Sequence, residues 1–481
     1  MSYPELVREK IDENFEEQLR TLKELIAIES VVSEEETAGD VVMPFGSGVQ
    51  RAFKYMLRKG GEFGLDTFNA DNFGGHLQWD GEDEGAETMG IVCHIDTVPL
   101  GSGWKHSPLD CEQADGRIYG RGTNDDKGPC IASLFAIKAL KDCGIKPHKN
   151  IRLILGLDEE TDWVGMEKYL QETEAPDFGF TPDADFPAIN AEMGILVFDI
   201  AKKFSRSTGG GLSLSSIKGG TAANMVADSA RAVVNSRDPD AYAAVIDEVE
   251  AWRQAGNADI HAKKTGRSLE IRVNGVSAHG AHPGLGKNAI SGLMAFLGNL
   301  TFDNDDVSEF IEFYNWHIGE ELNGESLGCL LEDEASGQTI LNVGMIDVDR
   351  KSARVTCNVR YPISKTDEDV YAGMEEVCNE YDLGIVKGKC EEPIFISAEK
   401  PLVKTLMDVY REHTGDKDSK PLVIGGGTYA RAFDNVVAFG ARFPGDEDVA
   451  HQKDEYIQVE QFKMITQIYA DAIYRLTCEE M

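Results

Sequence analysis

Two apolar segments that end in polar residues decide the fold: MGIVCHIDTVP at residues 89–99 and IRLILGLDEETDW at residues 151–163. An apolar run of this length is typical of a strand that is buried on both faces. Between the two, apolar residues recur at helical spacing over residues 131–140. A strand, a helix and a second strand predict an open α/β sheet, in which ligands bind outside the carboxyl ends of the strands.

The same kind of core strand returns near the end of the chain, at residues 421–424 and 435–445. The intervening strands and helices carry no further polar strand end of this type. We therefore predict one domain formed by residues 1–186 and 381–481, interrupted by a second domain at 187–380. Apolar residues at helical spacing predict further helices at 4–28, 49–59 and 457–478.

The composition excludes several classes of protein. The 481 residues are 42% hydrophobic and 27% charged, as in soluble globular proteins of two or three domains. Lys and Arg number 47 against 84 Asp and Glu, and the net charge of −37 repels phosphate, so we expect no nucleic-acid or membrane partner. Nine cysteines without a CxxC pair, and a start without a secretory pattern, predict a cytoplasmic protein with reduced thiols. The Gly- and Ser-rich segment 206–220 predicts a loop.

Four polar residues at the two strand ends are candidates for chemistry. His94 and Asp96 lie two apart on a strand, so both side chains project from one face. Glu159 and Glu160 are adjacent, and on an extended segment one could bind a metal while the other reaches a water molecule. Taken alone, the first pair is better explained as a polar strand end than as a metal site. Adjacent glutamates are also expected by chance among 84 acidic residues.

Other candidates lie in turns and loops. Asp125 in GRGTNDDKGP and Asp183 in TPDADFP are turn formers by default, and His451 would by default be a surface histidine. His279 and His282 lie in SAHGAHPG, where glycine and proline indicate a loop. No nucleophile signature such as GxSxG occurs. Spacing alone thus indicates an α/β enzyme that could depend on a metal.

As an ordered set these motifs are more specific. The chain resembles the superfamily of aminoacylases, carboxypeptidases and dipeptidases, metallopeptidase family twenty, from about residue 10 to its end. Two segments, 104–122 and 425–445, resemble its PepV-type dipeptidases. The resemblance implies a zinc-peptidase-like catalytic domain with a central mixed, mostly parallel sheet, interrupted by an α+β lid. The motifs that carry it are HIDTVP, GRGTNDDKGP, DEET, TPDADFP, SAHGAHPG, GGGTYARAF and a late histidine.

The resemblance also implies a set of metal ligands. His94 and Asp183 would hold one ion and Glu160 and His451 a second, with Asp125 bridging the two. Three carboxylates and two imidazoles suit two divalent ions, Zn²⁺ first and Mn²⁺ or Co²⁺ as further possibilities. A cis peptide bond is implied directly after Asp125.

The remaining roles follow from the same resemblance. Asp96 would orient the His94 ring, Glu159 would be the general base and later the general acid, and His279 would stabilise the oxyanion. The residues implied to hold the substrate are Arg360, which would grip its terminal carboxylate, Asn224 and Gly427.

These roles predict a metal-dependent dipeptidase that hydrolyses unblocked dipeptides, and thus a small peptide as substrate. An N-acyl-amino-acid deacylase or a carboxypeptidase would use the same chemistry, and a degenerate scaffold would merely bind peptides or metal. The long stretch between Asp183 and His451 favours the dipeptidase because it has room for a double-sized lid. A lid of that size also predicts a catalytically self-sufficient monomer.

Overall fold

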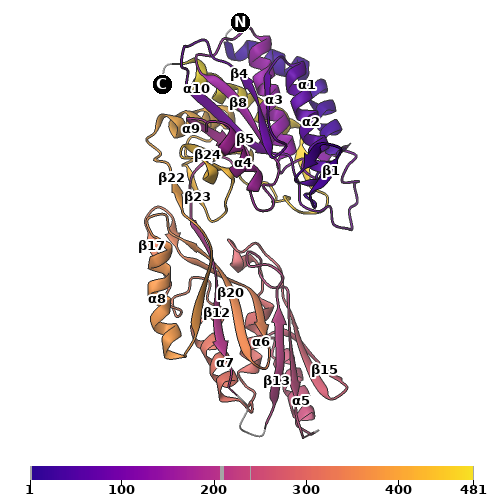
Figure 1. Ribbon diagram of the computed structural model, residues 1–481, viewed down its shortest axis with the longest axis vertical. Coiled ribbons are helices and arrows are strands. Elements are labelled where there is room, and N and C mark those ends of the chain that lie inside the picture. The colour runs from indigo at the N-terminus through magenta and orange to yellow at the C-terminus, as the bar shows by residue number, and fades with distance from the viewer. Residues whose placement is uncertain (1–2, 206–210, 239, 480–481) are drawn as a thin grey trace. The chain divides into compact units, whose positions relative to one another are not determined.

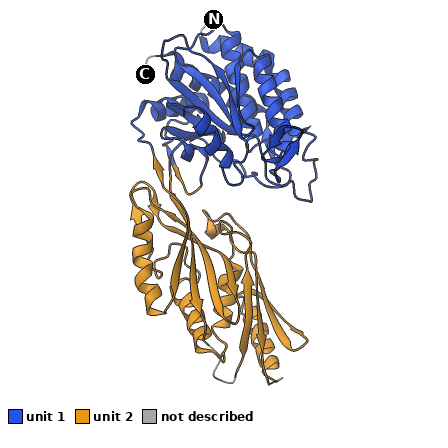
Figure 2. Ribbon diagram, viewed as in Figure 1, with its two compact units in different colours: residues 1–190, 396–422, 427–481 blue, residues 191–395, 423–426 orange. Residues whose placement is uncertain are grey.

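The computed structural model describes residues 3–205, 211–238 and 240–479. The chain forms two compact units, each with its own hydrophobic core (Figures 1 and 2). Unit 1 comprises Met1–Asn190, Ile396–Leu422 and Gly427–Met481, and unit 2 comprises Ala191–Phe395 and Val423–Gly426.

Unit 1 is built on a mixed sheet, which confirms the predicted α/β class. Its four central strands run parallel, in the order β24 (Val436–Phe439), β9 (Phe178–Thr181), β5 (Thr88–His94) and β8 (Asn150–Gly156). Antiparallel strands flank them: β4 (Gly74–Trp79) and β3 (Asp66–Ala70) beyond β8, and β11 (Ala188–Glu192) beyond β24. Two short strands that pair with β11 complete the nine-stranded sheet, β22 (Ile394–Phe395) and β23 (Leu422–Ile424), although β22 and most of β23 are counted with unit 2.

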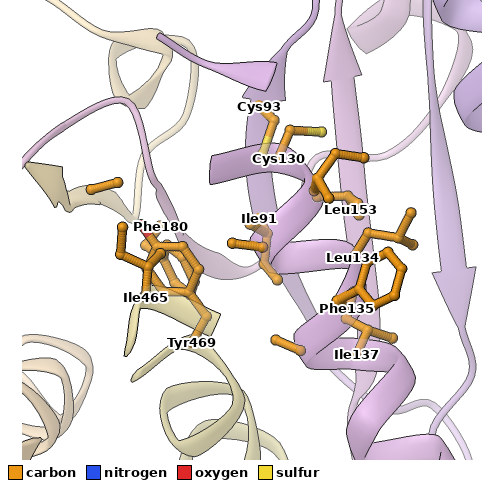
Figure 3. Close-up of a cluster of buried hydrophobic side chains, with 14 of the residues drawn as sticks. Ile91, Cys93, Cys130, Leu134, Phe135, Ile137, Leu153, Phe180, Ile465 and Tyr469 are labelled. Carbon is orange, nitrogen blue, oxygen red and sulfur yellow. The ribbon is translucent and has the colours of Figure 1, made fainter. Parts of the chain in front are cut away.

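The predicted helices of unit 1 form within a few residues of their expected bounds. They are α1 (Tyr3–Ile26), α2 (Gly46–Glu62), α3 (Lys127–Asp142) and α10 (Val459–Cys478), joined by α4 (Val164–Glu172) and α9 (Pro401–Thr414). Helices α1, α3 and α10 pack on one another, and α3 also packs on β5. Figure 3 shows the core between them and the sheet, where Ile91, Leu134, Leu153, Phe180 and Tyr469 are all fully buried. This packing fixes the strand ends from which the candidate residues project.

Unit 2 has an α+β architecture. An antiparallel sheet of eight strands has the order β15-β16-β14-β13-β19-β20-β12-β21. In chain order these are β12 (Gly194–Lys203), β13 (Ser213–Gly219), β14 (Ser229–Asn235), β15 (Asp259–Thr265), β16 (Ser268–Asn274), β19 (Ile340–Val348), β20 (Ser352–Tyr361) and β21 (Gly384–Glu391). Its helices are α5 (Ala241–Gln254), α6 (Ala289–Leu297), α7 (Asp305–His317) and α8 (Asp367–Glu380).

Short elements complete the described chain. The strands are β1 (Glu36–Ala38), β2 (Val41–Met43), β6 (Glu112–Ala114), β7 (Arg117–Tyr119), β10 (Ala184–Asp185), β17 (Glu332–Asp333), β18 (Gly337–Gln338), β25 (Ala441–Arg442) and β26 (Tyr456–Gln458), with 3₁₀ helices η1 (Pro283–Leu285) and η2 (Tyr429–Ala432). In unit 1, β26 pairs with β7 and so joins the end of the chain to the segment before α3. None of the described helices combines the length and apolar character needed to cross a membrane.

The predicted loop at 206–220 is wrong over residues 213–219, which form β13 between β14 and β19. Glycine and serine indicated a loop, but Leu214 and Ile217 are buried in the core of unit 2 and the two neighbouring strands supply backbone partners. Residues 206–210 lie outside the described part of the chain. Tertiary pairing here outweighs local composition.

Candidate active site

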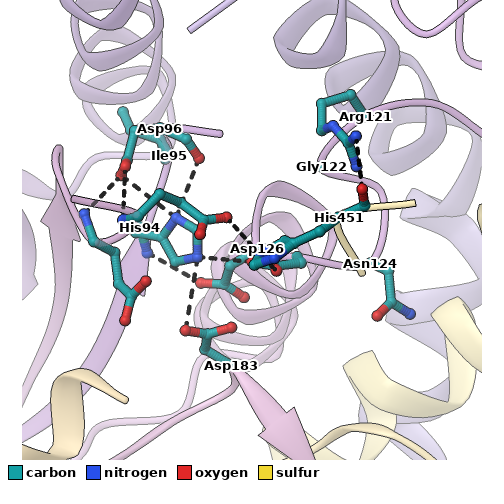
Figure 4. A network of polar contacts seen from close by, with 12 residues as sticks. His94, Ile95, Asp96, Arg121, Gly122, Asn124, Asp126, Asp183 and His451 are labelled. Carbon is teal, nitrogen blue, oxygen red and sulfur yellow. Dashed lines mark hydrogen bonds and ion pairs between the residues drawn. The ribbon is translucent and has the colours of Figure 1, made fainter. Parts of the chain in front are cut away.

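Parallel strand ends bring the candidate residues of unit 1 together. His94 is the last residue of β5, Glu159 and Glu160 come shortly after β8, and Asp183 shortly after β9. Because β8, β5 and β9 are parallel neighbours, their carboxyl ends meet at one edge of the sheet. Asp125 reaches the same edge from the loop before α3, where it contacts His94. Figure 4 shows His94, Asp183 and His451 within this network of polar contacts.

Asp125 lies between the two histidines and turns one carboxylate oxygen to each. Its Oδ1 is 2.9 Å from His94 Nε2, and its Oδ2 is 3.0 Å from His451 Nε2. Asp183 Oδ2 lies 3.6 Å from His94 Nε2, while Glu160 Oε1 lies 3.0 Å from His451 Nε2. The five residues thus form two half-sites that share Asp125, each with one histidine and one further carboxylate.

The donor set of this cluster fits divalent cations. Burial and the nearby Asp125 carboxylate raise the pKa of Glu160 and of Asp183, because several negative charges share one poorly solvated space. His94 Nδ1 lies 3.1 Å from the backbone oxygen of Asp96, so a proton on Nδ1 leaves the Nε2 lone pair facing the carboxylates. Nitrogen and oxygen donors that converge in this way hold metal ions, and positive charge there relieves the repulsion.

Asp96 holds more than the His94 ring. Its carboxylate oxygen Oδ1 is 3.4 Å from His94 Nδ1, in keeping with the expected orienting role. The same carboxylate accepts the backbone N–H groups of Glu159 at 3.2 Å and Glu160 at 3.1 Å. Asp96 is fully buried, so it couples the end of β5 to the turn after β8. Sequence spacing gave no sign of this second contact.

Glu159 lies beside the cluster. One of its carboxylate oxygens groups with ligand atoms of His94 and Asp183, all within 4.8 Å of one another. Burial and the Asp183 charge raise the pKa of Glu159 well above its usual value. The Trp163 indole Nε1 donates to the backbone oxygen of Glu159 at 2.7 Å and so anchors the turn. A buried carboxylate whose pKa is raised binds a proton more readily, as a general base and acid requires.

The peptide bond between Asp125 and Asp126 is cis, as the resemblance implies. Asp126 is buried and accepts the backbone N–H of His94 at 3.0 Å.

Within unit 2, the predicted oxyanion residue His279 and two predicted substrate residues, Asn224 and Arg360, lie in neighbouring segments. The backbone oxygen of Asn224 accepts the N–H of Gly280 at 2.7 Å, so Asn224 lies beside the His279 loop. Arg360 is buried on β20. A Cβ built on Gly425 would lie 3.5 Å from Arg360 Cγ and 3.3 Å from Ala281 Cβ, which brings Arg360 next to the same loop.

His282 and Gly427 are not brought together with these residues in the same way. The backbone N–H of His282 donates to the His279 oxygen at 2.9 Å at the start of η1, which is a structural turn contact. Gly427 lies in unit 1 and is exposed, shortly before η2. The predicted role of Gly427 in substrate binding stays a prediction.

Sequence reasoning missed Arg121 and Glu455, which form a buried ion pair next to the cluster. The available signals were their places in the chain, Arg121 within the GRG before Asp125 and Glu455 shortly after His451. Neither position differs in pattern from ordinary surface charge.

Comparison with known proteins places this site in a family. The profile of "Peptidase family M20/M25/M40" matches residues 90–475, which is most of the chain. The chain belongs to peptidase family M20. The resemblance to metallopeptidase family twenty is thereby confirmed, and M20 membership makes the chain a hydrolase whose His and carboxylate cluster suits divalent metal ions.

Individual relatives agree with the M20 assignment over the whole chain. "Putative dipeptidase YtjP" of Bacillus subtilis is 38% identical over 475 residues, 98% of this chain and 98% of that protein. A "Putative dipeptidase" of Staphylococcus epidermidis is 36% identical over 476 residues, 98% of this chain and 100% of that protein.

Solved structures share the M20 fold. Human carnosine dipeptidase 1 matches with a TM-score of 0.57 at 15% identity, over 98% of both chains. The dipeptidase Dug1p of Saccharomyces cerevisiae matches with a TM-score of 0.57 at 14% identity, also over 98% of both chains. At these identities the likeness concerns the fold alone, a catalytic unit interrupted by a second unit.

Proposed function

We propose that the protein is a metal-dependent dipeptidase that hydrolyses unblocked dipeptides with a water activated by two divalent ions. The observation that carries the proposal is Asp125, whose two carboxylate oxygens face His94 and His451. Two relatives that align end to end with this chain carry the name "Putative dipeptidase", and this supports the substrate class.

The proposal assigns one ion to His94 and Asp183, the other to Glu160 and His451, and both to Asp125. Zn²⁺ is the first choice, with Mn²⁺ and Co²⁺ next, because all three accept mixed imidazole and carboxylate ligands. When bound, two such ions lower the pKa of a water molecule and polarise a peptide carbonyl.

Glu159 then handles the proton. In the proposal its carboxylate takes the proton of the attacking water and passes it to the leaving amine. The contacts of its backbone with Asp96 and Trp163 keep the carboxylate in place during both transfers. Asp96 acts through neighbouring residues. It fixes the tautomer of His94 and holds the turn that carries Glu159 and Glu160.

Unit 2 supplies the substrate residues in this proposal, with residues 187–380 as a lid. His279 would stabilise the oxyanion, and Arg360 would bind the terminal carboxylate, for which a planar guanidinium is suited. Asn224 would hold the substrate beside them. The neighbouring placement of the three within unit 2 supports a shared task.

The direct test is turnover of a peptide panel after chelation and return of Zn²⁺, Mn²⁺ or Co²⁺. We expect metal-restored cleavage of dipeptides and little cleavage of tripeptides or N-acetylated amino acids. Preferred hydrolysis of the N-acetylated compounds would instead identify a deacylase. Equal cleavage of longer peptides from the carboxyl end would identify a carboxypeptidase.

The proposal also includes a self-sufficient monomer in the cytoplasm. Specific activity should then stay constant on dilution into the nanomolar range. Activity that is restored by mixing a Glu159 variant with a His279 variant would show that two chains share one site.

A further inference from the structure

A buried ion pair connects the two loops that carry Asp125 and His451. Arg121 and Glu455 are 3% and 0% exposed, and Arg121 Nη1 donates to Glu455 Oε2 at 2.6 Å. A buried charge is costly unless its remaining polar atoms also find partners. The other contacts of the pair therefore indicate where it acts.

Glu455 shapes the loop that carries Asp125. Its Oε1 accepts three backbone N–H groups, from Gly122 at 2.9 Å, Asn124 at 2.9 Å and Asp125 at 3.2 Å. Gly122 has φ +87°, which lets the chain curl around the carboxylate at little steric cost. Hydrogen bonds to a charged acceptor are stronger than neutral ones, so the loop and the direction of the Asp125 side chain depend on Glu455.

Arg121 holds the loop that carries His451. Its Nη2 donates to the backbone oxygen of His451 at 3.3 Å, and Figure 4 shows the guanidinium directed at that oxygen. His451 has φ +61°, a left-handed conformation that a residue with a Cβ rarely adopts. A contact on its own carbonyl favours that conformation and hence the direction in which the ring leaves the backbone.

We propose that Arg121 and Glu455 are positioning residues that set the separation of Asp125 and His451 and thereby the metal affinity of the half-site formed with Glu160. This inference rests on the proposed function, in which these ligands hold metal. The alternative is a pair that only stabilises the fold. The two differ in one observable, the affinity of a folded protein for metal.

The variant that separates them is Glu455→Gln. The amide keeps the volume and one oxygen for the three N–H groups, but its NH₂ faces another donor, the Arg121 guanidinium, so the pair is broken. Arg121→Met breaks the pair from the other side. The matched control is Arg152→Met in unit 1. Arg152 is also buried and donates to Gln78 Oε1 at 2.8 Å, but it lies near the start of β8, away from the site.

The measurement is a Co²⁺ titration of the metal-free full-length protein, followed by visible absorption. We expect one of two Co²⁺ equivalents to bind about 10- to 100-fold more weakly in Glu455→Gln and in Arg121→Met than in the wild type. The double variant should bind Co²⁺ no more weakly than either single variant does. Arg152→Met should lower thermal stability and keep wild-type Co²⁺ affinity. On a dipeptide, kcat should fall and KM should stay near its wild-type value.

A folded Glu455→Gln protein with wild-type Co²⁺ affinity would overturn the inference. If that variant does not fold, Arg121→Lys decides in its place, since a lysine cannot reach both Glu455 and the His451 oxygen; wild-type affinity there would overturn it equally. If the wild type binds two Co²⁺ but cleaves no dipeptide, the proposed substrate is wrong while the titration still decides the role of the pair. A wild type that binds no Co²⁺ would refute both the proposed metal-dependent function and the positioning role of the ion pair.

Discussion

Replacing Glu159 by glutamine isolates proton transfer from every other function of the site. The turn that holds Glu159 is anchored through its backbone: the N–H donates to Asp96 at 3.2 Å and the carbonyl accepts from Trp163 at 2.7 Å. Both contacts survive the substitution, because neither involves the Glu159 side chain. Glutamine has nearly the same volume but cannot accept a proton near neutral pH.

We therefore expect kcat on a dipeptide to fall by about 10²- to 10⁴-fold, which corresponds to roughly 2.7–5.4 kcal/mol of transition-state stabilisation. Thermal stability of the metal-free protein should stay the same or rise, because burial and the Asp183 charge disfavour the ionised Glu159. Steady-state kinetics, metal content and a melting curve measure all three. Turnover within about threefold of wild type in a metal-loaded variant would refute Glu159 as the general base.

Three further predictions concern binding, pH and packing. Arg360→Ala should lower kcat/KM on a dipeptide by about 10²-fold, because the charge-assisted contact with the terminal carboxylate is lost. Arg354→Ala, an exposed position on the same strand, is the control. Equal rates on a dipeptide and its C-terminal amide would contradict this prediction. Burial lowers the pKa of His76 to about 3, so below about pH 6.5 the unfolded chain binds a proton that the native chain does not. The free energy of unfolding should therefore fall by about 1.4 kcal/mol for each pH unit below about 6.5. Urea titrations at pH 7.5 and 5.5 should show that His76→Gln removes this dependence. Leu153→Ala should cost about 2–5 kcal/mol, because the side chain is fully buried in the core of unit 1, and a loss below about 1 kcal/mol in the same assay would contradict that packing.

The sequence by itself determined the class of the catalytic unit and the ends of its strands. Continuous apolar runs that stop at His94 and shortly before Glu159 are a local signal, because a strand buried on both faces excludes polar residues until it emerges from the core. Helical periodicity likewise located α1, α3 and α10. The ordered motifs added the family, which no single pattern carried.

Only the tertiary structure decided which residues meet. Asp125 and His451 are far apart in the sequence, and their approach depends on the parallel register of β5, β8 and β9 and on the pairing of β26 with β7. Local composition cannot encode such long-range pairing. For the same reason, composition predicted a loop for residues 213–219, which pair with neighbouring strands and form β13.

The contacts of Asp96 and Glu455 show the same limit at the level of single side chains. Both carboxylates accept backbone N–H groups from segments distant in the chain, Asp96 from the turn after β8 and Glu455 from the loop before α3. In the sequence they are two acids among 84, because a carboxylate acquires its partner from the space around it and not from its neighbours along the chain. Burial against those backbone groups turns two ordinary acidic residues into supports of the site.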